Sequence, residues 1–162
     1  MCLQSFDSEG INSIVDKYSD MVYRLAFART RNKENADDIF QEVFLRYIRK
    51  QPKFENEEHE KAWFIRVTIN CSKNLFNFLK RVNFEEFDEN ISEESKPDEI
   101  MDEFLDMLPI DYRTVIHLFY YERISTADIS KLLNKKESTV RMQLTRARRM
   151  LKDMMEEAKI NV

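Results

Sequence analysis

The chain has 162 residues, of which 43% are hydrophobic and 12% aromatic, enough to bury the core of one ordinary domain or of two small ones. A single glycine and three prolines, together with 35% charged residues, disfavour sheet-and-turn architectures and favour nearly continuous helix. The formal net charge of -4 excludes a uniformly basic nucleic-acid-binding protein, so the distribution of charge along the chain has to be considered. We therefore expect an all-α globular protein.

The sequence carries no sign of membrane insertion or of a metal site. Its first ten residues include two acidic residues, Asp7 and Glu9, where a signal peptide carries positive charge, and no apolar run is long enough to cross a bilayer, which predicts a cytoplasmic protein. Cys2 and Cys71 lie far apart without a CxxC pair, so neither zinc nor a disulfide is expected, and Cys71 is interpreted as a small core residue. His59 and His117 have no partner at ligand spacing and are interpreted as structural or surface residues.

Two helices are predicted at the start of the chain. Apolar residues recur at helical spacing over residues 14–26, and a second stripe follows from about residue 35 to residue 48, with acidic residues in its first turn where the helix dipole favours them. The polar side of the second helix contains Asp38, Gln41, Glu42, Leu45, Arg46 and Arg49. That side is either simply solvated or, because Leu45 lies among charged groups, a docking surface for a partner.

A loop is expected at residues 51–60, where Phe54 is the one large apolar side chain and can pin the loop to the core. The helix predicted at residues 61–81 has a broad apolar side and an opposite polar side. The polar side aligns an aromatic ring, cations and amides, namely Trp63, Arg66, Asn70, Lys73, Asn77 and Lys80. Such a line suits single-stranded nucleic acid, with cations tracking phosphates and the ring stacking on bases, and it also fits a half-buried Trp63 with solvated neighbours.

Residues 83–106 hold eleven carboxylates and one lysine, which accounts for the acidic total. Such a run is most simply a linker extended by self-repulsion, whose end around Phe104 and Leu105 joins the next helix. An acidic mimic of nucleic acid inside a basic partner is the alternative. The sequence therefore predicts two small helical domains, at residues 1–82 and 107–162, joined by an acidic linker at residues 83–106.

The C-terminal domain contains a predicted helix-turn-helix. Leu108-Pro109 opens a first helix, and residues 124–152 then form two helical patterns separated by four polar residues. Ser125 and Asp128 have the spacing of a capping box, and Asn134 tolerates the left-handed conformation that a tight turn requires. In the second helix one face is apolar, through Val140, Leu144, Ala147 and Leu151.

The other face of that second helix is strongly basic, which favours DNA recognition over a merely solvated surface because a capped helix and a turn precede it. Its N-terminal residues, Arg141 among them, are expected nearest the bases in the major groove, and Arg148 and Arg149 nearest the backbone. If Arg141 does not read bases, specificity has to come from Ser138, Thr139, Gln143 or the shape of the DNA. The candidate DNA-reading residues are Ser138, Thr139, Arg141, Met142, Thr145, Arg146 and Arg149.

No motif for a nucleophile, a nucleotide-phosphate loop, a dinucleotide-binding loop or a metal pair is present, so catalysis by this chain is not expected. A nucleic-acid-processing enzyme would need paired carboxylates on facing helices to hold a metal, and the acids here are interpreted as solvated. No cofactor is expected.

Three stretches resemble the extracytoplasmic-function (ECF) sigma factors of bacterial RNA polymerase. Residues 35–46 are similar to the family's polymerase-binding helix, in which an acidic pair, a Gln-Glu pair and a Phe-Leu pair keep these spacings. Residues 62–70 resemble its promoter-melting helix, and residues 108–151 resemble its helix-turn-helix domain, with Asn134 in place of a usual glycine and Met142-Gln143 in place of a commoner Ser-Arg. The resemblance covers nearly the whole chain.

The resemblance implies a role for each stretch. It implies that the clamp helices of the polymerase's largest subunit are bound by Asp37, Asp38, Gln41, Glu42, Leu45 and Arg46. Opening of the -10 element and capture of a base fall to Phe54, Asn56, Trp63, Arg66, Asn70 and Lys73, and the helix from residue 138 reads the -35 element. The implied partners are core RNA polymerase, promoter DNA and an anti-sigma factor. The alternative is a free-standing helix-turn-helix regulator whose N-terminal half senses a signal or dimerises.

Overall fold

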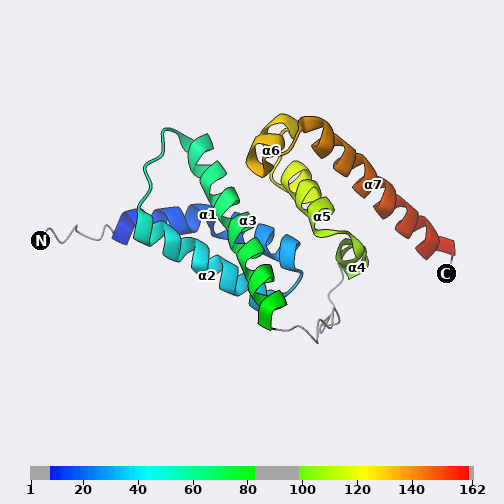
Figure 1. Cartoon of the computed structure of the whole chain (residues 1–162), viewed down its shortest axis with the longest axis horizontal. Coiled ribbons are helices and arrows are strands. Elements are labelled where there is room, and N and C mark those ends of the chain that lie inside the picture. Colours follow the sequence, from blue (N-terminus) through cyan, green and yellow to red (C-terminus); the bar gives the residue numbers. More distant parts are fainter. Residues whose placement is uncertain (1–7, 83–98, 161–162) are drawn as a thin grey trace, which may run out of the picture.

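The computed structural model describes residues 8–82 and 99–160, and all regular structure in these ranges is helical, which confirms the predicted all-α class (Figure 1). The N-terminal half consists of three helices, α1 (Ser8–Thr30), α2 (Lys33–Lys50) and α3 (Glu57–Val82). The C-terminal half consists of α4 (Glu99–Met107), α5 (Ile110–Ile116), the π-helical turn η1 (His117–Tyr121), α6 (Thr126–Leu133) and α7 (Glu137–Ile160). The prediction of a loop at residues 51–60 is wrong for the last four residues, which belong to α3.

Helix α3 begins earlier than predicted because Asn56 caps it. The Asn56 Oδ1 atom accepts a hydrogen bond of 2.8 Å from the backbone amide of His59, and three glutamates in the first turn interact favourably with the helix dipole. The acidic segment expected to be a linker ends in the helix α4, whose first residue is Glu99. The part of that segment at residues 83–98 lies outside the described residues.

The N-terminal core is built around Phe64, which is fully buried. The Phe64 ring stacks on Tyr18 of α1 at a centroid distance of 4.4 Å and meets Phe44 and Tyr47 of α2 at 5.7 and 5.5 Å. Cys71 is also buried there, as predicted, and burial raises the pKa of its thiol. One side chain of α3 thus joins all three N-terminal helices, which fixes the orientation of the opposite, polar side of α3.

The two halves of the chain pack against each other, and their buried apolar residues form one contiguous cluster. At the contact, Arg113 of α5 reaches the end of α1, where the last carbonyl groups of a helix lack partners within the helix. Its Nε atom donates to the carbonyl oxygen of Ala28 at 2.8 Å, and its Nη2 atom donates to that of Arg29 at 3.0 Å. A cation from the C-terminal half therefore caps a helix of the N-terminal half, where the helix dipole favours positive charge.

Arg29 of α1 forms a second contact between the two halves. Its side chain donates to the hydroxyl groups of Ser72 on α3 and Thr114 on α5, the latter at 2.7 Å from Nη1. Beside this contact, Arg31 forms ion pairs with Asp102 and Asp106 of α4 at 3.1 and 2.6 Å. Acidic residues of the predicted linker thus bind the end of α1.

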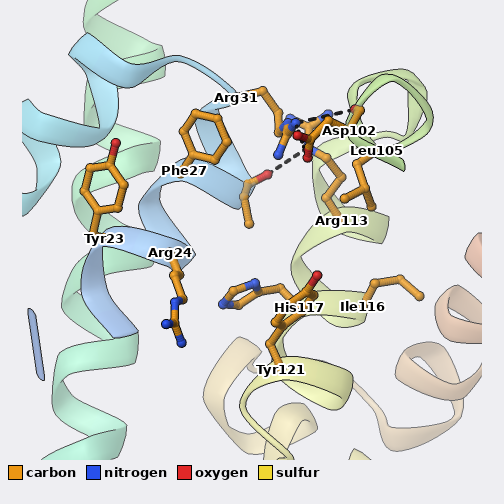
Figure 2. A pocket seen from close by; sticks show the side chains of 11 residues that line it. Tyr23, Arg24, Phe27, Arg31, Asp102, Leu105, Arg113, Ile116, His117 and Tyr121 are labelled. Atoms are coloured by element: carbon orange, nitrogen blue, oxygen red, sulfur yellow. Dashed lines mark hydrogen bonds and ion pairs between the residues drawn. The ribbon is translucent and has the colours of Figure 1, made fainter. Parts of the chain in front are cut away.

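A cavity of about 210 Å³ lies along the same seam and is shown in Figure 2. Tyr23, Arg24 and Phe27 of α1 line one side, and His117 and Tyr121 of η1 line the other. The His117 and Tyr121 rings stack at a centroid distance of 5.2 Å. His117 is therefore a structural residue of the seam, in line with its sequence interpretation.

Candidate nucleic-acid and polymerase interfaces

The helix-turn-helix is held by the local contacts that the sequence predicts. The Ser125 hydroxyl oxygen accepts a hydrogen bond of 3.1 Å from the backbone amide of Asp128, which caps α6. Asn134 ends α6 in the left-handed conformation, with φ of 52°. Across the turn, the Thr126 hydroxyl donates to the Glu137 carboxylate at 2.9 Å, so the first turn of α6 is tied to the first turn of α7. These contacts confirm the predicted cap and turn and set the angle at which α7 leaves α6.

Helix α7 buries one side and exposes the other. Val140, Leu144 and Ala147 are buried against the rest of the C-terminal half. Of the candidate DNA-reading residues, Thr139 is half-buried, and the exposed ones are Ser138, Arg141, Met142, Thr145, Arg146 and Arg149. The helix therefore carries its candidate residues on a solvent-facing side that can lie in a DNA groove.

Two residues of α7 differ from the expectation of a uniform outer face. Gln143 is only 8% exposed, and its Oε1 atom is buried without a hydrogen-bond partner among the described residues, so it does not face outward. Arg148 is exposed, but its Nε atom donates to the hydroxyl of Tyr120 in η1. The heptad-like spacing of α7 alone could not show that the end of η1 lies beside Arg148.

Helix α3 presents Arg66, Asn70 and Lys73 together on its exposed side. Trp63, which the sequence placed in the same line, is half-buried within an aromatic cluster. Its ring centroid lies 4.9 Å from Phe64 and 5.9 Å from Phe54. Trp63 is thus half-buried, as one of its two sequence interpretations expects, and its contact with nucleic acid stays a prediction.

The Phe54 and Asn56 loop is ordered by its own contacts. Phe54 packs on His59 as well as on Trp63, with a centroid distance of 5.5 Å to the imidazole, which fits the expectation that it pins the loop. The side-chain oxygen of Asn56 is engaged as the cap of α3. A nucleotide that binds here would therefore meet a preformed surface with the Asn56 oxygen already occupied.

Electrostatic contacts hold the start of α3 against α1. The Lys17 ammonium lies 3.0 Å from Glu57 and 3.1 Å from Glu60, and the Tyr18 hydroxyl donates to Glu60 at 2.6 Å. Burial, reinforced by this hydrogen bond, raises the pKa of Tyr18 to about 12, so the hydroxyl remains a donor at neutral pH. These contacts fix the helix start beside the Asn56 loop.

Three of the candidate polymerase-binding residues lie on the side of α2 that faces away from the core. The Asn32 side chain caps the helix by accepting from the Asn35 amide at 2.9 Å. Leu45 is 43% exposed, and Gln41 and Asp38 lie on the same side one and two turns earlier, respectively. This side of α2 is therefore accessible to a partner, but a single exposed leucine does not by itself indicate a docking surface, because isolated apolar residues are common on protein surfaces.

The remaining candidates of α2 occupy the edges of this face. Glu42 and Arg46 are half-buried and pair with each other at 3.0 Å, four residues apart. Asp37 is also half-buried and lines a shallow hollow against Arg24 of α1. The structure therefore brings together five of the candidates and places Asp37 toward α1.

Residues 8–82 and 99–160 contain no group of three His, Cys, Asp or Glu side chains that could hold a metal ion. In the same two ranges, no helix is long and apolar enough to cross a membrane.

Sequence comparisons match both halves of the chain. The family model of sigma-70 region 2 matches residues 14–82, and that of sigma-70 region 4 matches residues 98–151. The ECF RNA polymerase sigma factor SigE of Mycolicibacterium smegmatis is 28% identical over 155 residues, which cover 88% of this chain but 60% of SigE. The RNA polymerase sigma factor SigV of Bacillus subtilis is 28% identical over 148 residues, which cover 88% of both chains.

Solved structures show the same fold. The sigma factor RpoE of Bartonella quintana, solved in complex with the anti-sigma factor NepR, superposes with a TM-score of 0.78 at 19% identity over 91% of this chain and 98% of RpoE. CnrH, solved in complex with the cytosolic domain of CnrY, superposes with a TM-score of 0.69 at 18% identity over 94% of this chain and 92% of CnrH.

Sigma-70 region 2 followed by region 4, together with the exposed faces of α2, α3 and α7, defines a two-domain sigma factor, a DNA-binding subunit of bacterial RNA polymerase. The chain belongs to the ECF sigma factors, which direct promoter-specific initiation of transcription.

Proposed function

We propose that this sigma factor docks on core RNA polymerase through α2, opens the -10 element with α3 and reads the -35 element with α7. The observation that supports this most strongly is the outer side of α7, where a run of exposed cationic and hydroxyl side chains lies opposite a fully buried apolar stripe. Counterion release from phosphates next to such a run would supply affinity, and the residues near the start of α7 would supply base contacts.

Docking on the polymerase would use Leu45 and the polar residues around it. Burying an exposed leucine against a partner removes apolar surface from water, while Asp38 and Gln41 would give the contact its orientation. This role accounts for a leucine among charged residues on a helix whose core positions are already filled.

Opening of the -10 element would use the exposed side of α3. Arg66 and Lys73 would follow the phosphates, and Asn70 would offer amide donors and acceptors to an unpaired base. The open side of the Trp63 and Phe54 pair would stack on or wedge against bases, because the packed side of each ring holds it in place.

In this proposal the chain works in the cytoplasm, and the polymerase supplies all the catalytic groups. An anti-sigma factor is a further proposed partner, since RpoE, whose fold this chain shares, was solved with one.

The proposal is tested by reconstituted transcription. Purified chain is added to core polymerase on a library of promoter fragments, and run-off transcripts are sequenced. We expect transcripts from a subset of fragments that share two upstream elements. We expect the Leu45→Asp variant to produce none of these transcripts and to lose co-purification with the core enzyme. A free-standing regulator would instead bind its DNA in the absence of polymerase. When it is mixed with core polymerase and no other sigma factor, it would give no new transcripts.

A further inference from the structure

One arginine on the outer side of α7 is held by an aromatic corner that lies outside the helix-turn-helix. The guanidinium carbon of Arg148 lies 5.5 Å from the ring centre of Phe119 and 5.4 Å from that of Tyr120. Its Nε atom also donates a hydrogen bond to the Tyr120 hydroxyl. Arg146 and Arg149, its neighbours on the helix, are exposed. The orientation of Arg148, in contrast, is defined by its contacts with Phe119 and Tyr120.

The π-helical turn η1 builds this corner. The Glu122 amide donates to the carbonyl oxygen of His117 at 3.2 Å, five residues back, so the helix widens at its end. Within this wider turn the Phe119 and Tyr120 rings meet edge to face at 5.0 Å and 83°. Such turns are often found at functional sites, because they shift the direction in which the following side chains point.

The bonding of Arg148 leaves its phosphate-binding groups available. Nε is used by Tyr120, so the two terminal nitrogens of the guanidinium keep their donors in a planar fork, which matches two oxygens of a phosphate. The Tyr120 hydroxyl accepts the bond from Nε and so fixes the orientation of the guanidinium. The terminal nitrogens of Arg148 can then present several donors to a single anion.

The position and charge of Arg148 also fit a phosphate. It lies on the same side of α7 as Thr145 and Arg141, three and seven residues earlier, and so continues the row of candidate DNA-reading residues. Within the described part of the chain, Arg141 pairs with Glu137 and Lys152 approaches Glu156, but no carboxylate lies within ion-pair distance of Arg148. Its charge is thus held in place without being neutralised.

We propose that Tyr120 is a positioning residue that, together with Phe119, holds Arg148 as a preorganised site for one backbone phosphate of the upstream promoter element. An arginine already fixed by a ring and a hydrogen bond loses less side-chain freedom on binding than a free one, so more of the contact energy appears as affinity. The inference rests on the proposed function, since the phosphate belongs to the DNA that α7 reads.

The test measures promoter binding by the complex of the chain with core polymerase at several salt concentrations. Arg148→Ala is expected to weaken all variants of the upstream element alike and to reduce the slope of log K against log salt by about one. Tyr120→Phe keeps the ring and removes the hydroxyl, and it is expected to weaken binding about 2- to 10-fold, as for one lost hydrogen bond. In the Arg148→Ala background, Tyr120→Phe is expected to have no further effect.

Tyr121→Phe is the matched control, because Tyr121 is the next residue, is exposed and stacks on His117 rather than on Arg148. It is expected to bind like the wild type. A second measurement replaces single phosphates of the upstream element with uncharged methylphosphonates. One replacement should weaken the wild-type complex and have no effect on the Arg148→Ala complex, which identifies the phosphate.

The inference is overturned if Tyr120→Phe binds as tightly as the wild type, or if its effect persists in full without Arg148. It is also overturned if Arg148→Ala leaves the salt slope unchanged. These outcomes differ from failure of the proposed function, in which the wild-type complex itself would show no preference for any promoter element.

Discussion

The arginines at the seam between the two halves and those on the outer side of α7 belong to opposite environments. Arg29 and Arg113 are 4% and 9% exposed and donate to hydroxyl and carbonyl oxygens on other helices. Arg141 and Arg149 are exposed, and Arg141 has only a loose contact of 3.4 Å with Glu137 on its own helix. The same side chain thus stabilises the fold in one place and remains available to DNA in the other.

The difference shows what burial does to a cation. Desolvation lowers the pKa of Arg29 to about 10, with Asp111 opposing the shift and Arg113 adding to it, yet the guanidinium stays charged at neutral pH. Its hydrogen bonds offset the loss of water, but a buried cation held by neutral oxygens is weak support for stability. An exposed arginine on α7 makes little contribution to folding and keeps its full charge for phosphates.

The largest effect is expected from removing the buried arginine with the most carbonyl partners. Arg113→Ala leaves the carbonyl oxygens of Ala28, Arg29 and Leu108 without its hydrogen bonds, the last of which is 2.6 Å long. We expect the free energy of unfolding to fall by about 3 kcal/mol, since buried polar groups without partners cost about 1 to 3 kcal/mol each. Urea unfolding followed by circular dichroism measures this change.

Arg149→Ala is the control for this measurement, and its unfolding free energy should stay within about 0.5 kcal/mol of the wild type. If the two variants lost the same free energy of unfolding, burial would not explain why one set of arginines stabilises the fold and the other does not.

The next effect concerns base recognition. Arg141 lies one turn into α7, where a recognition helix meets base edges, so Arg141→Ala should weaken binding of the preferred upstream element by about 1 to 3 kcal/mol. It should also flatten discrimination among single-base variants. Binding of the polymerase complex to a set of such variants measures both quantities. An equal loss on every variant would assign Arg141 to the backbone and leave specificity to other residues of the exposed side.

A smaller and less selective effect is expected farther along the helix. Arg149→Ala should weaken all variants of the element alike and lower the salt slope by about one, because a contact to phosphate carries no base information. Titration at several salt concentrations checks this. A loss confined to one base pair would place Arg149 at a base edge instead.

The smallest effect is expected from a replacement at the seam. Arg29→Met removes the buried charge but keeps a long side chain, and exchanging a buried charge for an apolar group of similar size is often close to neutral. We expect the free energy of unfolding, measured in urea, to change by less than about 1 kcal/mol, and promoter discrimination to remain as in the wild type. A loss as large as that of Arg113→Ala would mean that the hydroxyl contacts of Arg29 stabilise the seam far more than its burial costs.

The sequence predicted the elements whose causes are local. The cap at Ser125, the turn at Asn134 and the exposed line of Arg66 and Asn70 depend on side chains a few residues apart, and the structure has them where helical spacing places them. The polar turn and the apolar stripe of α7 were likewise sufficient to define the helix-turn-helix.

The sequence did not reveal contacts between distant segments. Arg113 meets the end of α1 more than eighty residues away, and helical periodicity shows only which side of a helix is buried, not what covers it. The same limit applies to Gln143, which reads as polar and outward but is buried, and to Arg148, whose partner Tyr120 belongs to another helix. The early start of α3 is a different case, because the Asn56 cap is local and the glutamates after it are themselves a helix-start signal, which a search for apolar periodicity alone passes over.

The central claim is that the outer side of α7 lies on the upstream promoter element when the chain is bound to polymerase. Photo-crosslinking tests it directly, with a benzophenone amino acid in place of the exposed Met142 and, as control, in place of the exposed Glu157 near the end of the same helix. The account predicts crosslinks from position 142 to a few adjacent bases near the -35 position, formed only with core polymerase present. Crosslinks of equal strength from both positions, or none from position 142 in an active promoter complex, would contradict it.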